Sequence, residues 1–159
     1  MHTIHLEQAK ASKPHHSGFN RAGLSYDNGE VPPITASKPK RVLIVDDDSG
    51  IRGLVRAVLS RAGYEVDEAA DGADGLAAMS RLPYDAVILD LMMPGVNGFQ
   101  VVAQLEEKGS YPRCVIIMSA AAESTIQELQ SPVIHSKIRK PFDITALLGA
   151  LRACTSATD

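Results

Sequence analysis

The chain has 159 residues, of which 45% are hydrophobic and 22% are charged, so it has the composition of a globular protein and room for one ordinary domain. Its formal net charge of −3 and the lack of a long Lys/Arg cluster argue against nucleic-acid binding. No apolar stretch approaches the roughly 20 residues of a membrane-spanning helix, and no signal-peptide core follows Met1, so we expect a cytoplasmic protein without a membrane partner.

Residues 1–39 differ in composition from the rest of the chain. They contain four of the five histidines, the pair Pro32-Pro33 and no sustained apolar periodicity. A segment of this kind cannot bury enough apolar surface to offset the entropy of ordering, so we expect a flexible N-terminal arm. The folded domain is expected over residues 40–155, with a short tail over 156–159 and no output domain attached.

From residue 41 onward, short apolar runs alternate with helical periodicity. Residues 42–45 are a continuous run of β-branched residues and leucine, which is typical of a strand buried on both faces. Apolar residues at helical spacing then follow Ser49, a candidate helix cap, and stop at Gly63. The same alternation predicts four more strands and four more helices, at 65–69, 72–81, 86–89, 98–108, 114–118, 123–130, 133–138 and 144–154. The pattern predicts an α/β fold: a doubly wound, five-stranded parallel sheet with helices on both faces, of the flavodoxin-like type.

The two cysteines give no sign of a disulfide or a metal site. Cys114 lies in an apolar run and Cys154 lies near the C-terminus, and their spacing fits no metal-ligand pattern. We therefore expect two reduced thiols that serve only to fill the core.

Polar residues follow the predicted strands at the points where the strands end: Asp46-Asp47-Asp48 after the first, Asp90 after the third, Ser119 after the fourth and Lys140-Pro141 after the fifth. Functional groups of open parallel sheets collect at the carboxyl ends of the strands, so we expect these side chains to lie close together. Converging carboxylates repel one another unless a cation lies among them, which predicts Mg²⁺ and Lys140 at this edge. A hydroxyl and an ammonium group beside carboxylates favour the binding of a phosphoryl group.

Taken together, these motifs resemble the receiver domain of two-component response regulators, in particular the single-domain chemotaxis type. The resemblance rests on residues 42–48, 87–98, 116–120 and 140–142, and it covers about residues 40–154. It implies a set of site residues: Asp90 as phosphoacceptor, Asp46, Asp47, Asp90 and the Met92 carbonyl as Mg²⁺ ligands, and Ser119 and Lys140 as the switch hydroxyl and the phosphate-binding lysine. It also implies a cis bond between Lys140 and Pro141.

The resemblance further implies a signalling function and its partners. A histidine kinase or histidine phosphotransferase would phosphorylate Asp90 in the presence of Mg²⁺. Output would pass to a downstream protein through the side formed by residues 123–130, 133–138 and 144–154. The chain would accept a phosphoryl group and promote its own phosphorylation and dephosphorylation, without being a conventional enzyme.

Some positions depart from the family pattern. Receivers commonly carry Tyr or Phe three residues before the lysine, where this chain has Lys137, so we expect no aromatic switch. Ser131-Pro132 replaces the usual small residues before the fifth strand, which predicts a short or displaced preceding helix. Met92 and Ala121 flank the site and cannot orient a hydrolytic water well, which predicts a long-lived phosphoryl group.

Three alternatives remain. A flavodoxin would need a phosphate loop after the first strand, where Asp46 and its neighbours would repel a flavin phosphate. A phosphatase of the haloacid dehalogenase type would need a second Asp two residues after Asp90, and this position is Met92. The strongest alternative is a receiver fold that binds partners without being phosphorylated, which Lys137 and the altered helix region favour.

Overall fold

The computed structural model describes residues 38–109 and 112–156, so most of the predicted N-terminal arm and most of the predicted tail lie outside the described residues. Five strands form one parallel sheet: β1 (Arg41–Val45), β2 (Glu65–Ala69), β3 (Ala86–Leu89), β4 (Val115–Ser119) and β5 (Ile134–Arg139). Five helices connect and follow the strands: α1 (Ser49–Arg61), α2 (Gly72–Arg81), α3 (Gly98–Lys108), α4 (Glu123–Glu128) and α5 (Ile144–Ser156). The strand order is β2-β1-β3-β4-β5, which confirms the predicted doubly wound α/β fold.

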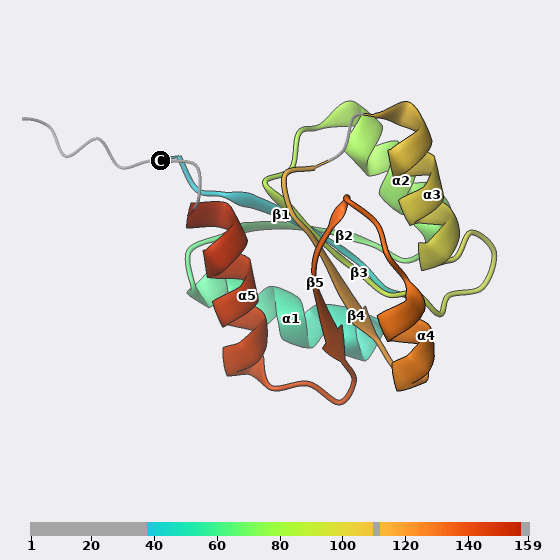
Figure 1. Cartoon of the computed structure of the whole chain (residues 1–159). Coiled ribbons are helices and arrows are strands. Elements are labelled where there is room, and N and C mark those ends of the chain that lie inside the picture. Colours follow the sequence, from blue (N-terminus) through green and yellow to red (C-terminus); the bar gives the residue numbers. More distant parts are fainter. Residues whose placement is uncertain (1–37, 110–111, 157–159) are drawn as a thin grey trace, which may run out of the picture. The chain divides into compact units, whose positions relative to one another are not determined.

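The helices cover both faces of the sheet. Helices α1 and α5 lie on one face and helices α2, α3 and α4 on the other (Figure 1). Alternate residues of each central strand enter the two cores: Leu43 and Val45 of β1 pack toward α2 and α3, whereas Val42 and Ile44 pack toward α1 and α5. This double burial explains why β1, β3 and β4 each contain an uninterrupted run of four apolar residues.

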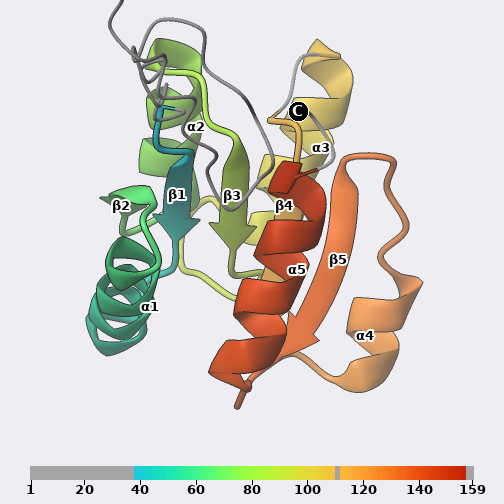
Figure 2. The ribbon, with the colours of Figure 1, turned by 90° about the vertical axis from the view of Figure 1, so that its left-hand side faces the viewer.

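All five strands run in the same direction, so their carboxyl ends share one edge of the sheet (Figure 2). In register, Val45 of β1 lies beside Leu89 of β3, and Leu89 lies beside Ile117 of β4. The residues that follow β1 and β3 therefore come out next to each other. The topology thus brings the predicted polar residues to one place.

The element boundaries differ from the prediction in a few places. Asp48, and not Ser49, caps α1, with its carboxylate accepting the main-chain N–H groups of Gly50 and Ile51. Strand β4 begins one residue later than predicted and includes Ser119. Helix α4 ends two residues early, ahead of the Ser131-Pro132 turn, while α5 continues two residues beyond Cys154.

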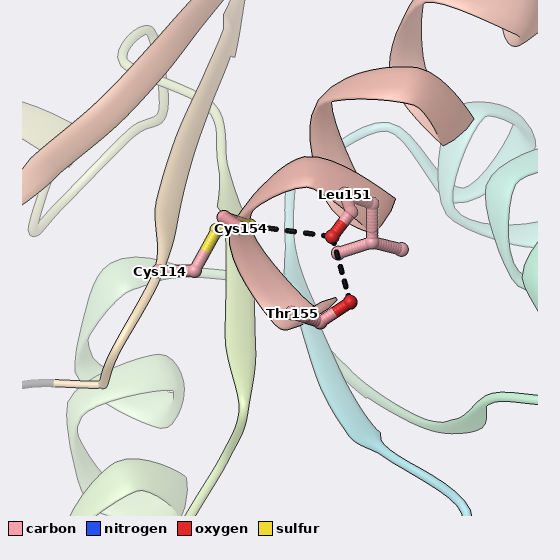
Figure 3. Close-up of a disulfide and its surroundings, with 4 residues drawn as sticks. All are labelled: Cys114, Leu151, Cys154 and Thr155. Atoms are coloured by element: carbon pink, nitrogen blue, oxygen red, sulfur yellow. Dashed lines mark hydrogen bonds between the residues drawn. A yellow bond between two sulfur atoms is a disulfide. The ribbon is translucent and has the colours of Figure 1, made fainter. Parts of the chain in front are cut away.

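The prediction of two reduced thiols was wrong. Cys114, just before β4, and Cys154, near the end of α5, form a disulfide with their Cα atoms 5.8 Å apart (Figure 3). Both residues are buried, and Cys154 lies beside the main-chain oxygen of Leu151, to which the Thr155 hydroxyl donates a hydrogen bond of 2.8 Å. The pairing joins the two ends of the segment that contains β4, α4, β5 and α5.

Within residues 38–109 and 112–156, none of the helices combines the length and the apolar character that crossing a membrane requires.

Candidate functional site

The loop after β1 supplies two of the predicted carboxylates. Asp46 is fully buried, and its Oδ1 accepts a hydrogen bond of 2.9 Å from the main-chain N–H of Asp48. Asp47 is exposed, and within the described ranges nothing donates a hydrogen bond to its carboxylate. Asp48 points back to its own helix as the α1 cap, where the N–H groups of Ile51 and Gly50 hold the pKa of its carboxyl below the usual value. Asp46 and Asp47 therefore face the site, whereas Asp48 does not.

Asp90 follows β3 and lies at the bottom of the same site. It is 4% exposed, and its Oδ1 accepts the main-chain N–H of Met92 at 3.2 Å. Burial raises the pKa of the Asp90 carboxyl, and the charge of Asp46 raises it further, against the opposing effects of the Met92 N–H and Lys140. An additional cation at this site would favour the charged carboxylate.

Lys140 connects the two carboxylates from the end of β5. Its Nζ donates to Asp46 Oδ2 at 2.6 Å and lies 3.3 Å from Asp90 Oδ2. Burial alone would lower the pKa of Lys140, but the hydrogen bond to Asp46 and the charges of Asp90 and Asp46 outweigh it and raise the pKa. The Lys140–Pro141 bond is cis, as the family resemblance implied, and the Lys140 N–H donates to the Ser119 carbonyl at 2.8 Å.

Ser119 ends β4 beside this cluster but does not bond to it. The residue is fully buried, and its Oγ accepts the main-chain N–H of Ala121 at 3.2 Å. Within the part of the chain that the structure describes, the Ser119 hydroxyl donates no hydrogen bond to Asp90 or Asp46. The hydroxyl is thus held toward its own loop.

The residues fit a divalent cation. Carboxylate oxygens of Asp46, Asp47 and Asp90 lie within 4.8 Å of one another. Among the described residues, this is the only group of three or more Asp, Glu, His or Cys side chains that could hold a metal ion. Oxygen donors are the ligands that Mg²⁺ prefers. Asp47 has its carboxylate free to bind, and Asp46 and Asp90 each keep acceptor capacity beyond their present bonds.

The remaining predicted residues surround the cluster. Met92 is 58% exposed at the rim, whereas Ala121 is buried and belongs to the apolar core on the α2, α3 and α4 side. Lys137 lies opposite Ile117 in the sheet, and its Nζ donates to the Gln127 carbonyl of α4 at 3.4 Å. Met92 is therefore accessible to solvent beside the site, whereas Ala121 is enclosed in the core.

Two features of this region were missing from the sequence prediction. Arg52 of α1 donates from Nη1 to the main-chain oxygen of Asp46 at 2.7 Å. Gly98 allows α3 to approach so closely that an added Cβ would lie 2.2 Å from the Asp90 carbonyl oxygen. One signal in the sequence could have indicated the Arg52 contact: an Arg in the first turn of the helix that follows the acidic loop.

Comparison with known proteins identifies the family. The family model described as the response regulator receiver domain matches residues 42–152. The chain therefore belongs to the response regulator receiver domain family.

Relatives and solved structures agree with this assignment. The DNA-binding dual master transcriptional regulator RpaA of Synechocystis sp. is 37% identical over 122 residues, which cover 75% of this chain and 50% of RpaA. The transcriptional regulatory protein ResD of Bacillus subtilis is 41% identical over 102 residues, 64% of this chain and 42% of ResD. The chain thus spans about half the length of these curated relatives.

The structural relatives include a complex that bears on the site. TrrA of Thermotoga maritima, solved with Mg²⁺ and BeF, aligns with a TM-score of 0.66 and 31% identity over 72% of this chain and 98% of that one. The chemotaxis response regulator CheY4 of Vibrio cholerae aligns with a TM-score of 0.67 and 31% identity over 74% and 99%. Since RpaA is described as DNA-binding, the expectation that nucleic acid plays no part finds no support in these comparisons.

Proposed function

We propose that this protein is a phosphoacceptor in a two-component system or phosphorelay, phosphorylated on Asp90 by a histidine kinase or a histidine phosphotransferase. The observation that carries the proposal is the cluster at the carboxyl edge of the sheet. Three carboxylates converge there, and Lys140 Nζ lies 2.6 Å from Asp46 and 3.3 Å from Asp90. Membership in the receiver family supports it.

In this proposal the phosphoryl group passes from a histidine nitrogen to a carboxylate oxygen of Asp90. The P–N bond of the donor breaks and a P–O bond to Asp90 forms. The second ring nitrogen of the donor takes up a proton from solvent, so that the imidazole leaves as the neutral ring. Asp90 acts as the nucleophile and is oriented by the Met92 N–H. The protein promotes the transfer by positioning and charge balance, without being a conventional enzyme.

The other residues of the cluster have distinct proposed roles. Asp46, Asp47, Asp90 and the Met92 carbonyl hold Mg²⁺, which when bound balances the charge of the carboxylates and of the phosphoryl oxygens. Lys140 binds a phosphoryl oxygen, and its raised pKa keeps it positively charged for this purpose.

Ser119 is the proposed switch hydroxyl. At present its Oγ accepts the Ala121 N–H. A phosphoryl oxygen on Asp90 offers a charged acceptor for the hydroxyl proton, and charge-assisted hydrogen bonds are stronger than neutral ones. Rotation of the hydroxyl toward the phosphoryl group would release the Ala121 N–H and shift the loop between β4 and α4.

Output passes, in this proposal, to a downstream protein through the side formed by α4, β5 and α5. Lys137 occupies the position where receivers commonly carry an aromatic residue, and its bond to the Gln127 carbonyl holds it against α4. Burying its charge in the space that Ser119 would vacate would cost several kcal/mol, so Lys137 is expected to remain outside that space. The signal would then travel through the loop after Ser119 and the charge at the sheet edge.

A direct test is the mass of the intact protein after incubation with acetyl phosphate. We expect the addition of one phosphoryl group in Mg²⁺, none in excess chelator and none in Asp90→Asn. Asp85→Asn is a matched control, because Asp85 lies at the opposite end of β3 and accepts the Arg41 N–H instead of facing the site. Labelling of Asp90→Asn at the wild-type rate would contradict the proposal.

A receiver that binds partners without phosphorylation is the second candidate, favoured by Lys137 and the short helix α4. The same experiment distinguishes the two. A folded wild-type protein that takes up no phosphoryl group from acetyl phosphate or from histidine kinases would favour this second function.

A further inference from the structure

The main-chain carbonyl of Asp46 is held by a side chain from helix α1. Asp46 follows Val45, the last residue of β1 that pairs with both neighbouring strands. Its N–H still bonds to the Ala69 carbonyl at 3.2 Å, and its own carbonyl accepts Arg52 Nη1 at 2.7 Å. A buried carbonyl at a strand end requires a partner, and the guanidinium group supplies it.

Arg52 is itself held in place. Its side chain is only 17% exposed, and its Nε lies 3.6 Å from Glu68 Oε1 at the end of β2. Glu68 is fixed in turn by Arg56, whose Nη1 lies 2.9 Å from Glu68 Oε2. The guanidinium group of Arg52 therefore joins the end of β2 to the acidic loop after β1.

The contact with the Asp46 carbonyl affects the next residue directly. The Asp46 carbonyl and the Asp47 N–H belong to one planar peptide group, so fixing the oxygen fixes the plane from which Asp47 leaves. No hydrogen bond or ion pair from the described residues orients the Asp47 carboxylate. The main chain therefore sets the point from which the Asp47 side chain extends toward Asp46 and Asp90.

We propose that Arg52 is a positioning residue for the Mg²⁺ site: through the Asp46 carbonyl it holds the peptide group from which the Asp47 carboxylate reaches the metal. The inference rests on the proposed function, because it concerns the metal ligands of that site. It adds a residue that does not itself touch the metal.

The direction in which Mg²⁺ affinity changes when Arg52 is removed distinguishes a positioning role from a purely electrostatic one. The positive charge of Arg52 lies beside the acidic loop, because its Nη1 bonds to the Asp46 carbonyl at 2.7 Å. As a charge alone, Arg52 opposes the binding of a cation, and its removal would strengthen Mg²⁺ binding. As a positioning residue, its removal weakens binding.

The test is Mg²⁺ affinity, measured on the full chain by isothermal titration calorimetry. Arg52→Met is expected to weaken binding about ten-fold, the loss typical of residues that orient metal ligands. Arg52→Lys, which keeps a charged donor, should recover part of the loss. Arg61→Met is the matched control, because it also removes a positive charge from α1 but lies in the last turn of that helix, away from the acidic loop, and it should bind Mg²⁺ like the wild type or slightly more tightly.

Two further variants make the result decisive. Arg52→Gln is neutral and shorter and should also weaken Mg²⁺ binding. It replaces Arg52→Met in the test if thermal unfolding shows that Arg52→Met is not folded. Affinity that is unchanged or stronger in the folded Arg52 variants would overturn the inference. If Asp47→Ala binds Mg²⁺ like the wild type, the metal site of the proposed function fails as well; if Asp47→Ala loses affinity while Arg52→Met does not, only the role of Arg52 is wrong.

Discussion

A single glycine determines how closely α3 approaches the proposed phosphoacceptor. A Cβ at Gly98 would lie 2.2 Å from the Asp90 carbonyl oxygen and 2.7 Å from Leu91 Cα, so either the helix or the loop must move to accept one. Gly98→Ala is expected to lower the free energy of unfolding by about 1 to 3 kcal/mol. Because Asp90 moves with its carbonyl, phosphorylation should slow by up to about 100-fold.

Chemical denaturation and the rate of acetyl phosphate labelling would measure both effects. Gly53→Ala is the matched control, since nothing lies within 4 Å of an added Cβ there. Alanine in this exposed helical position should stabilise the protein by about 0.5 to 1 kcal/mol and leave labelling unchanged. A Gly98→Ala protein that labels as fast as Gly53→Ala would contradict the argument.

The exposed side chain of Met92 bears on the lifetime of the phosphoryl group. At 58% exposure it can cover the approach to Asp90 but cannot orient a water molecule for hydrolysis. Met92→Asn should therefore speed the loss of phosphate several-fold, as measured by intact mass after removal of the donor. An unchanged or slower loss would refute this role.

Ala121 was expected to share this role with Met92, and the structure places it differently. It is buried in the apolar core, so a charged replacement such as Glu would face desolvation before it could reach a water molecule. Ala121→Ser is the suitable companion to Met92→Asn, because it adds a hydroxyl with little volume. Its effect on the lifetime should be smaller than that of Met92→Asn.

At the scale of elements, the disulfide joins the start of β4 to the end of α5. Its residues are separated by 40 positions in the sequence. Closing a loop of that length restricts the unfolded chain and, in the chain-entropy model, stabilises the fold by about 4 kcal/mol. Thermal unfolding with and without reductant should therefore show a clearly lower melting temperature for the reduced protein.

Cys154→Ser provides the control for this experiment. The variant should melt near the temperature of the reduced wild type, and reductant should not change it. A wild-type protein whose melting temperature is the same in both conditions, with its thiols unreactive before reduction, would show that the disulfide contributes no stability.

The elements could be predicted where sequence periodicity is strong. Strand β3 and helix α3 have the predicted bounds, because a fully apolar run and a helical repeat closed by Gly109 leave little choice. Helix α4 was predicted too long, because its six residues are too few for a clear repeat. The disulfide escaped prediction because only the fold brings Cys114 and Cys154 together.

The sequence also predicts which residues meet at the site, but it does not predict how their side chains are oriented. Residues directly after parallel strands must meet at one edge, which was enough to place Asp46, Asp90 and Lys140 together. The direction of a side chain within that edge depends on local hydrogen bonds. The sequence therefore could not predict the contact of Arg52 with the Asp46 carbonyl or the orientation of the Ser119 hydroxyl.

At the scale of the whole molecule, residues from Lys38 onward form a compact unit of their own, and the core clusters of the described residues lie between Val42 and Cys154. A chain that begins at Lys38 should therefore fold and take up a phosphoryl group as the full chain does. We expect its free energy of unfolding to lie within about 0.5 kcal/mol of the full-length value. A truncated protein that is insoluble, or that labels more slowly, would show that residues 1–37 contribute to the fold.

The identity of the phosphorylated residue is the most direct test of the proposed function. Reduction of the phosphorylated protein with borohydride converts an aspartyl phosphate to homoserine, and peptide mass mapping then identifies the position. The clustering of Asp46, Asp47 and Lys140 around Asp90 predicts one modified residue, Asp90, only when Mg²⁺ is present during phosphorylation. Homoserine at Asp46 or Asp47, or modification of Asp90 at the same rate in chelator, would contradict it.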